Sequence, residues 1–577
     1  MPSRSGSIHV ATTKRLYQGT LYQTHLLRRS YRVGPQVKHE TLGNISHLPD
    51  ELIELIRRFL AGERFVSVAE SFAVERCLPH GHVEAVLGMI RKLELDTLIY
   101  SKRCRERDLV LAMIVERLLH QCSKLATTRW WHETTLAEEL GVADASEDDL
   151  YAALDWLLDR QPQIEKKLAT RHLTEGGRVL YDVSSSYYEG RTCPLAVFGH
   201  DRDGQKGLPI IVYGLLTDAE GRPVAVDVYP GNTGDPTTVA DQVEKLRQRF
   251  GLERVVLVGD RGLLTRTQLK TLRQYPGLGW ISALRSTEVR SLIDTGCLQL
   301  SLFDQQNLAE IHSPDFPDER LVACHNPLLA DQRRRKRQEL VAATEADLER
   351  ISQQVKRRTK TLLTEAEIGL KVGRVLNRYK MAKHFTVKIA DGQFEWSRNV
   401  EAIRREERLD GIYVIRTSEP EPQLSAPNAV RYYKSLSQVE QAFRCLKGMD
   451  LRVRPIHHRT EDHVRAHIFL CLLAYYVEWH MREALAPLLF ADEDLKQNRA
   501  TRDPVATAEP STAVKVKKAI RLTADGLPVH SFDSLLEALG TRCRNTCRVK
   551  ATSANARFTQ LTEPTPLQAR AYQLLGL

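Results

Sequence analysis

The sequence predicts an α/β core with an inserted, mainly helical domain, preceded by a small β-meander with a helix and by an all-α region. Two observations predict this class. Between residues 175 and 286, short apolar runs alternate with helical patterns, which is typical of strands and helices packed in layers. Between residues 287 and 411, a long Arg-rich helical pattern interrupts that alternation, and an apolar run at 412–417 resumes it.

The first 174 residues are expected to form two units. Residues 8–45 alternate polar with apolar or aromatic side chains, and residues 48–60 have helical spacing, so residues 1–61 predict a β-meander plus a helix. Its basic strands could dock on DNA, or the unit could be a small solubilising domain. Residues 62–174 show helical periodicity and predict an all-α region for DNA binding or dimerisation.

The first part of the core, residues 175–286, predicts the order strand, strand, strand, helix, strand, helix, strand. The expected strands lie at 178–183, 208–217, 223–229, 255–258 and 280–284. This is the order of a ribonuclease-H-like mixed sheet, in which the first and fourth strands are neighbours. The core is expected to continue at 412–490, after the insertion at 287–411, and residues 491–577 are expected to be a linker and tail.

Bulk properties exclude several classes of protein. The length of 577 residues excludes a single small domain, and a formal net charge of +10 favours a polyanionic partner. The ten cysteines form no CxxC pair, so neither a zinc ribbon nor a disulfide framework is indicated. Because the chain has no leading apolar segment and no run of about eighteen apolar residues, we expect a cytoplasmic protein without a membrane partner. The absence of a GxxxxGK[ST] pattern argues against a nucleotide partner.

Two aspartates stand at the ends of predicted core strands. Asp182 closes the run RVLYDV, and Asp260 follows the run VVLV. A carboxylate at the end of a buried strand must be desolvated unless something pairs with it. Each could be a simple strand-end cap, but two such residues on predicted neighbouring strands favour a shared cation.

A third carboxylate, Glu440, lies on the predicted helix SLSQVEQAFRCLKGM. Its spacing places it on the apolar stripe of that helix, where a glutamate needs a partner. Leu436, Val439, Phe443 and Leu446 make up the stripe. A salt bridge to Arg444, at i+4, is the alternative to a catalytic role.

Three carboxylates are the ligand set that hard Mg²⁺ or Mn²⁺ ions prefer. Two such ions about 4 Å apart activate the attacking oxygen and stabilise the leaving oxygen in phosphoryl transfer. The sequence therefore predicts a site for two cations, with Asp182, Asp260 and Glu440 as both catalytic residues and metal ligands.

The segments around these carboxylates carry a family resemblance. YDVSSSYYE, LVGDRGLL and YYKSLSQVEQAFRCLK resemble the three catalytic blocks of DDE insertion-sequence transposases. The last block is similar to the insertion sequence four superfamily, whose helix reads tyrosine, two residues, arginine, three residues, glutamate, six residues, lysine. Tyr433, Glu440 and Lys447 match in register, whereas Leu436 occupies the arginine position.

The resemblance implies a transposase that cuts and rejoins DNA at terminal inverted repeats. It implies that Tyr433 and Lys447 contact DNA phosphates, and Arg444 or Lys434 could replace the missing arginine. It also implies a synapse of two or more protomers on double-stranded transposon ends and target. A non-catalytic, domesticated DNA-binding protein and a structure-selective nuclease on the same fold are the alternatives.

Two further clusters carry charged or potential metal-binding side chains. The basic run Arg333, Arg334 and Arg335 could neutralise DNA phosphates, or it could be a solvated helix face. A histidine cluster raises the alternative of a zinc site, but the chain has no HExxH pattern. Its members are His457, His458, His463 and His467.

Overall fold

The computed structural model describes residues 6–63, 65, 71–550 and 556–577. The chain divides into two compact units. The first comprises Met1–Cys77 and Arg544–Thr562, and the second comprises Leu78–Cys543 and Glu563–Leu577. The second unit contains all the residues predicted to be catalytic.

The first unit holds two small antiparallel sheets. Strands β1 (Ser7–Tyr17), β2 (Thr20–Val33) and β3 (Gln36–Asn44) form a meander, and α1 (Asp50–Leu60) follows it. The other sheet has the order β16 (Arg557–Leu561), β15 (Cys543–Val549), β4 (Phe72–Pro79). Strand β4 lies in a stretch for which the periodicity predicts only helices. It is a strand because its pairing partner comes from the far end of the chain, which local periodicity does not register.

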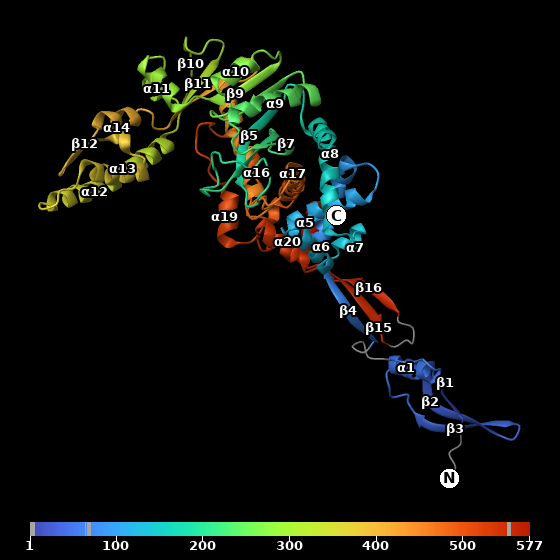
Figure 1. Cartoon of the computed structure of the whole chain (residues 1–577). Coiled ribbons are helices and arrows are strands. Elements are labelled where there is room, and N and C mark those ends of the chain that lie inside the picture. Colours follow the sequence, from blue (N-terminus) through green and yellow to red (C-terminus); the bar gives the residue numbers. More distant parts are fainter. Residues whose placement is uncertain (1–5, 64, 66–70, 551–555) are drawn as a thin grey trace. The chain divides into compact units, whose positions relative to one another are not determined.

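The second unit is built around an eight-stranded mixed sheet with the order β10-β11-β14-β9-β8-β5-β6-β7 (Figure 1). The first five of these strands in chain order are β5 (Arg178–Tyr187), β6 (Ile210–Asp218), β7 (Pro223–Pro230), β8 (Val255–Val258) and β9 (Leu278–Ala283). The last three are β10 (Leu308–Ile311), β11 (Arg320–His325) and β14 (Ile412–Thr417). Strands β5, β8 and β9 run parallel to one another, whereas β6, β7 and β14 each pair antiparallel with their neighbours.

The predicted adjacency of the first and fourth core strands is confirmed, because β5 pairs directly with β8. The long connection between β7 and β8 allows this crossover. It contains η2 (Asp235–Thr238), α9 (Val239–Glu244) and η3 (Lys245–Arg249). Helix α10 (Arg266–Leu272) then connects β8 to β9.

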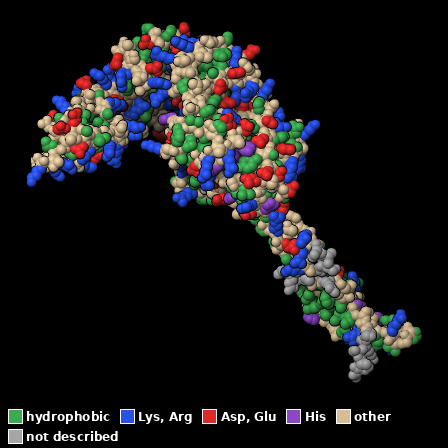
Figure 2. Space-filling model, in the orientation of Figure 1, with side chains coloured by type: hydrophobic (Ala, Val, Ile, Leu, Met, Phe, Trp, Pro, Cys, Tyr) green, Lys and Arg blue, Asp and Glu red, His purple; other side chains and the backbone are tan. Residues whose placement is uncertain are grey.

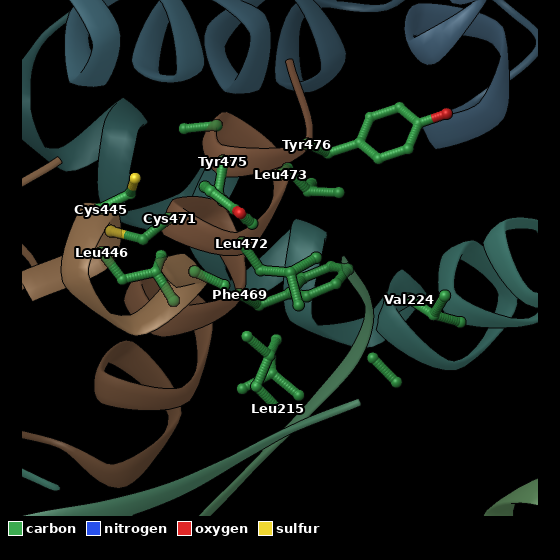
Figure 3. Close-up of a cluster of buried hydrophobic side chains, with 14 of the residues drawn as sticks. Leu215, Val224, Cys445, Leu446, Phe469, Cys471, Leu472, Leu473, Tyr475 and Tyr476 are labelled. Atoms are coloured by element: carbon green, nitrogen blue, oxygen red, sulfur yellow. The ribbon is translucent and has the colours of Figure 1, made fainter. Parts of the chain in front are cut away.

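The helices that carry and support Glu440 cover this sheet. They are α15 (Ala426–Lys434), α16 (Ser437–Lys447) and α17 (Glu461–Ala484). Figure 3 shows side chains of α16 and α17, among them Leu446 and Phe469, gathered with Leu215 of β6 in one buried cluster. Helix α17 is buried along most of its length, as the apolar run at 468–477 predicts. Within the described residues, no helix is long and apolar enough to cross a membrane.

Helices from the preceding region pack on one another. They are α3 (Gly81–Lys92), α4 (Leu95–Ile99), α5 (Arg105–Leu119), α6 (Lys124–Trp130), α7 (Leu136–Leu140) and α8 (Glu147–His172). Among them, α3, α5 and α8 also pack against α17. Trp131 is fully buried in their shared core. A capping box on Ser146 and Asp149 starts α8, which leads directly into β5.

The insertion is shorter than the 125-residue range predicted for it, because β10 and β11 belong to the large sheet. The separate part consists of α12 (Pro327–Arg357), α13 (Glu365–Tyr379), the hairpin β12 (Phe385–Ala390) and β13 (Gln393–Arg398), and α14 (Val400–Glu407). These elements have an apolar core of their own. Arg337 on α12 donates two hydrogen bonds to Asp410, at 2.9 and 2.6 Å, just before β14.

The C-terminal residues form a folded part of both units. Helices α18 (Leu495–Thr501), α19 (Thr512–Ile520), α20 (Phe532–Gly540) and α21 (Pro566–Leu575) belong to the second unit. Helices α20 and α21 pack against α3, and the Tyr572 hydroxyl donates to the carbonyl of Gly81 at 3.1 Å. The sequence predicted a linker and tail here because the segments are short and their partners are distant.

Candidate active site

Asp182 lies within β5, and Asp260 follows the end of the neighbouring parallel strand β8 at the matching level. Leu180 of β5 is paired with Val258 of β8, and each aspartate comes two residues later. Because side chains alternate along a strand, the two carboxylates project from the same face of the sheet, in the same edge region. The strand pairing therefore brings together two residues that are 78 positions apart.

The Asp260 carboxylate is held by its own turn. Its Oδ1 atom accepts the backbone N–H groups of Gly262 at 2.8 Å and Leu263 at 2.7 Å. A Cβ atom at position 262 would lie 3.3 Å from this oxygen, so a glycine suits the close approach. The aspartate itself is exposed, and its second oxygen is available to a ligand.

Glu440 lies in the first turn of α16, beside the buried face of that helix. The predicted stripe of Leu436, Val439, Phe443 and Leu446 is buried. Glu440 was expected to share this stripe, but its side chain is exposed. It stands at the margin of the stripe, which avoids the cost of burying an unpaired carboxylate. In the part of the chain that the structure describes, Glu440 forms no ion pair with Arg444, so the alternative salt bridge is not formed.

The three carboxylates act on one another electrostatically. Burial, followed by the charges of Asp260 and Glu440, raises the pKa of Asp182 to about 7, against a hydrogen bond from Val183 and the positive charge of Arg202. Across the described ranges, none of the three carboxylates forms an ion pair within 4.0 Å. A divalent cation would relieve this repulsion, so the residues present fit a metal.

Tyr433 on α15 lies beside the same three carboxylates. Burial, together with the charges of Asp260, Glu440 and Asp182, raises its pKa to about 12, although Arg261 acts in the opposite direction. The neutral phenol can therefore donate a hydrogen bond near the site without adding charge.

The carboxylates do not form a closed metal cage. Over the residues that can be described, one group of three or more metal-ligating side chains has its ligand atoms within 4.8 Å of one another, and it is Cys445, Asp450 and Glu478. Asp182, Asp260 and Glu440 are therefore more widely spaced than a fully assembled site.

The residues predicted to contact DNA phosphates have different environments. Lys447 donates to Asp203 at 3.0 Å and is largely buried. Lys434 donates to the carbonyls of Val505 and Ala506, at 3.1 and 3.4 Å. Both amines therefore already have partners within the chain.

Leu436, at the position of the family's arginine, has 9% of its surface exposed and belongs to the core. Arg444 is exposed on α16. Of the two candidate replacements for the arginine, Arg444 is thus the one whose side chain is open to solvent. Its contact with DNA stays a prediction.

Sequence reasoning missed the loop between β5 and β6. Asp203 in this loop is almost fully buried and forms ion pairs with both Lys447 and Arg454. It also accepts the N–H of Tyr187 at 3.3 Å. Its neighbour Arg202 pairs with Asp235. The available signal was the charged run HDRDGQKG between two apolar strands, which reads as an ordinary surface loop.

The histidine cluster has other contacts. His463 lies 3.3 Å from Asp155, and its ring stacks on Tyr151. His467 is buried, and its Nε2 atom lies 3.2 Å from the carbonyl of Val453. These contacts describe packing between α17 and its neighbours.

The basic run on α12 is on the surface. Arg333, Arg334 and Arg335 are exposed, and Figure 2 shows Lys and Arg side chains gathered along this helical part of the second unit. Arg334 pairs with Asp331 at 3.1 Å, and Arg333 donates to the carbonyl of Leu409 at 3.4 Å. Such exposed contacts are weak and can be exchanged for a phosphate.

Two parts of the chain match known families. Residues 199–477 match the family described as transposase DDE domain. Residues 10–70 match the N-terminal domain of the IS1634 family of transposases. The chain belongs to the DDE transposases.

The matched range of the DDE transposase domain contains Asp260 and Glu440 but begins after Asp182. The two matches confirm the resemblance to insertion-sequence transposases, and the protein is a DNA transposase. No curated protein matches the sequence. Among solved structures, a piggyBac transposase synaptic complex with hairpin DNA is similar at a TM-score of 0.34 and 9% identity, over 80% of this chain and 76% of that chain. This likeness is too low to support an argument.

The pKa of Asp182 predicts how the stability of the metal-free transposase depends on pH. The pKa is raised from 3.8 to about 7 in the folded state, so the folded protein keeps a proton that the unfolded chain has lost. The stabilisation is present below pH 4 and is lost as the pH rises to about 7. We expect Asp182→Asn, which cannot ionise, to gain stability relative to wild type over this window.

Chemical denaturation of both proteins in EDTA, between pH 4.5 and 8, checks this expectation. Asp241→Asn, a change of an exposed carboxylate on α9, serves as the control and should show no such trend. A difference between Asp182→Asn and wild type that is constant with pH would contradict it.

Proposed function

We propose that Asp182, Asp260 and Glu440 form the catalytic carboxylate set of this transposase and hold two Mg²⁺ or Mn²⁺ ions. The observation that carries the proposal is the strand register, in which Asp182 and Asp260 each come two residues after the paired Leu180 of β5 and Val258 of β8. The charge of Glu440 acts on Asp182 across the same space. Carboxylates that repel one another and lack ion pairs are suited to binding divalent cations.

The order β7-β6-β5-β8-β9, with β5, β8 and β9 parallel, supports a ribonuclease-H-like assignment of this part of the sheet. In such a sheet, catalytic side chains gather at the ends of neighbouring central strands. Strands β14, β11 and β10 extend the sheet on the β9 side, and the separate helical part is inserted between β11 and β14.

The chemistry follows from what each side chain can do. When bound, the cations supply activation of the attacking oxygen and stabilisation of the leaving oxygen. Asp260 is oriented by two backbone N–H groups, and Asp182 loses its proton as the site fills. Tyr433 donates a hydrogen bond to a phosphate oxygen of the bound DNA. Water as nucleophile gives strand cleavage, and a DNA 3′-hydroxyl gives strand transfer.

The protein binds double-stranded DNA at transposon ends through its basic surfaces, and two or more copies hold two ends. The three exposed arginines on α12 are part of this surface. We expect the change of Arg333, Arg334 and Arg335 together to Gln to weaken binding of all DNA sequences equally. Each lost phosphate contact should reduce the slope of log K against log salt by about 0.9.

Fluorescence anisotropy at several salt concentrations measures this slope. Arg105→Gln is the control, since Arg105 is an exposed arginine paired with Asp144 on another part of the second unit. An unchanged slope for the triple variant would place the DNA elsewhere.

An assay with labelled end DNA, a target plasmid and Mg²⁺ or Mn²⁺ tests the proposed function. Joined products are expected. A shifted but uncut band would indicate a domesticated DNA-binding protein, and cuts without joining would indicate a structure-selective nuclease. Crosslinking of paired ends in the same reaction reports the number of protomers in the synapse.

A further inference from the structure

A second group of potential metal ligands lies on and beside α16, the helix that carries Glu440. Cys445 belongs to α16, Asp450 follows that helix, and Glu478 belongs to α17. Their ligand atoms lie within 4.8 Å of one another. Cys445 has 2% of its surface exposed and Glu478 has none. Figure 3 shows Cys445 among the buried side chains of α16 and α17.

One oxygen of this group lacks a hydrogen-bond partner. The Oε1 atom of Glu478 accepts from Arg482 Nε at 2.5 Å. Its Oε2 atom is buried and has no hydrogen-bond partner among the residues that the structure describes. A buried carboxylate oxygen without a hydrogen-bond partner is unfavourable, because its lost contacts with water are not replaced. Such an atom in a natural protein calls for a ligand that the hydrogen-bond network does not include.

The net charge of the group favours a divalent cation. Once an ion displaced the thiol proton, a thiolate and two carboxylates would carry three negative charges, whereas Arg482 provides one positive charge through contacts to both Glu478 and Asp450. Two negative charges remain uncompensated. Gln441 donates a hydrogen bond to the Cys445 sulfur at 3.6 Å. Burial and the charge of Glu478 raise the pKa of the Cys445 thiol, so its proton would leave as the ion binds.

We propose that Cys445, Asp450 and Glu478 bind a Zn²⁺ ion at a structural site separate from the catalytic carboxylates. One thiolate and two carboxylates suit this borderline-soft ion better than Mg²⁺ or Ca²⁺. Bonds of about 2.3 Å to sulfur and about 2.0–2.2 Å to oxygen place tetrahedral ligands roughly 3.5 Å apart. The ligand atoms, which lie within 4.8 Å of one another, must therefore approach by at most about 1.3 Å, and Asp450, with 26% of its side chain exposed, has the freedom to move.

A cavity beside the three residues offers both a path for the ion and a place for the fourth ligand. Asp450 and Gln441 line a cavity of about 1330 Å³, from which an ion can enter and a water can complete the tetrahedron. The bound ion would join α16 to α17 five residues after Glu440. Zinc would thereby restrain the helix that positions the third catalytic carboxylate.

The test uses the full-length chain and Co²⁺ as a spectroscopic substitute for Zn²⁺, with excess Mg²⁺ present to occupy sites made only of oxygen ligands. A cobalt–thiolate charge-transfer band that saturates at one ion per chain, and that Zn²⁺ abolishes, is the expected result. Cys445→Ser should remove the band, and Glu478→Gln should weaken Co²⁺ binding about tenfold or more. Asp182→Asn should leave the band unchanged.

Cys471→Ser is the matched control, because Cys471 is also fully buried on α17 but lies outside the group. Absence of the band in wild type, or its loss in Cys471→Ser instead of Cys445→Ser, would overturn the proposal. If Cys445→Ser does not fold, the test uses thiol labelling of the wild-type protein, measured by mass spectrometry. Zn²⁺ should then slow the labelling of Cys445 in wild type, and equal rates with and without Zn²⁺ would also overturn the site.

Discussion

Alanine at position 182, 260 or 440 is expected to abolish strand cleavage while DNA binding is largely kept. In the proposed site, each of Asp182, Asp260 and Glu440 supplies charge to the same cations, and the cations contribute several kcal/mol of transition-state stabilisation. Since each 1.36 kcal/mol is a factor of ten in rate, we expect a loss of roughly 10³-fold or more for each variant. Cleavage of labelled end DNA and a gel-shift assay at one salt concentration measure the two properties.

The control for these variants is Asp241→Ala, which removes an exposed carboxylate from the same unit. It should cleave at the wild-type rate. A more specific test of metal binding uses Asp260→Cys, whose thiolate binds Mn²⁺ better than Mg²⁺. Partial recovery in Mn²⁺ alone would identify Asp260 as a metal ligand. Wild-type cleavage by any of the alanine variants would remove that residue from the site.

Asp203→Ala is expected to have the largest effect on stability. The Asp203 side chain is 2% exposed and pairs with Lys447, which is 11% exposed, and with Arg454. Removal of the carboxylate leaves two neighbouring positive charges without a counter-ion, and broken buried pairs of this kind cost about 3–5 kcal/mol. Chemical denaturation of the full chain measures the loss.

Two comparisons show whether the loss comes from the uncompensated charge. Adding Lys447→Met to Asp203→Ala should restore part of the stability, because only one positive side chain then lacks its counter-ion. Asp144→Ala breaks an exposed pair with Arg105 and should cost no more than about 1 kcal/mol. If Asp203→Ala lowers the free energy of unfolding by as little as Asp144→Ala, the Asp203 carboxylate does not stabilise the end of α16.

The same ion pair bears on the predicted contact between Lys447 and DNA. Its amine is held by Asp203 at 3.0 Å, and one bond of this kind leaves two donors free for a phosphate. Asp203 thus fixes the end of the helix that carries Glu440, and it connects this end to β5 through the N–H of Tyr187. The resemblance to known transposases gave a role to the lysine and none to its partner.

Features that depend on neighbouring residues were predictable from the sequence. The apolar runs ending near Asp182 and Asp260 predicted strands β5 and β8, and the spacing of Leu436, Val439 and Phe443 predicted a helix with a buried face. The order of the elements predicted that β5 and β8 are neighbours, because few chain paths allow two parallel central strands. The quoted blocks around the three carboxylates indicated the transposase family.

What the tertiary structure decided depends on residues far apart in the chain. The pairing of β4 with β15, the inclusion of β10 and β11 in the sheet and the burial of Asp203 have no local pattern. The exposure of Glu440 also depends on what covers its helix, since periodicity gives the direction of a side chain but not the presence of a neighbour. Local pattern alone therefore determined which segments form the core and carry the carboxylates. Long-range pairing and burial determined their spacing and their charged partners, because desolvation and Coulomb energies depend on distances in space.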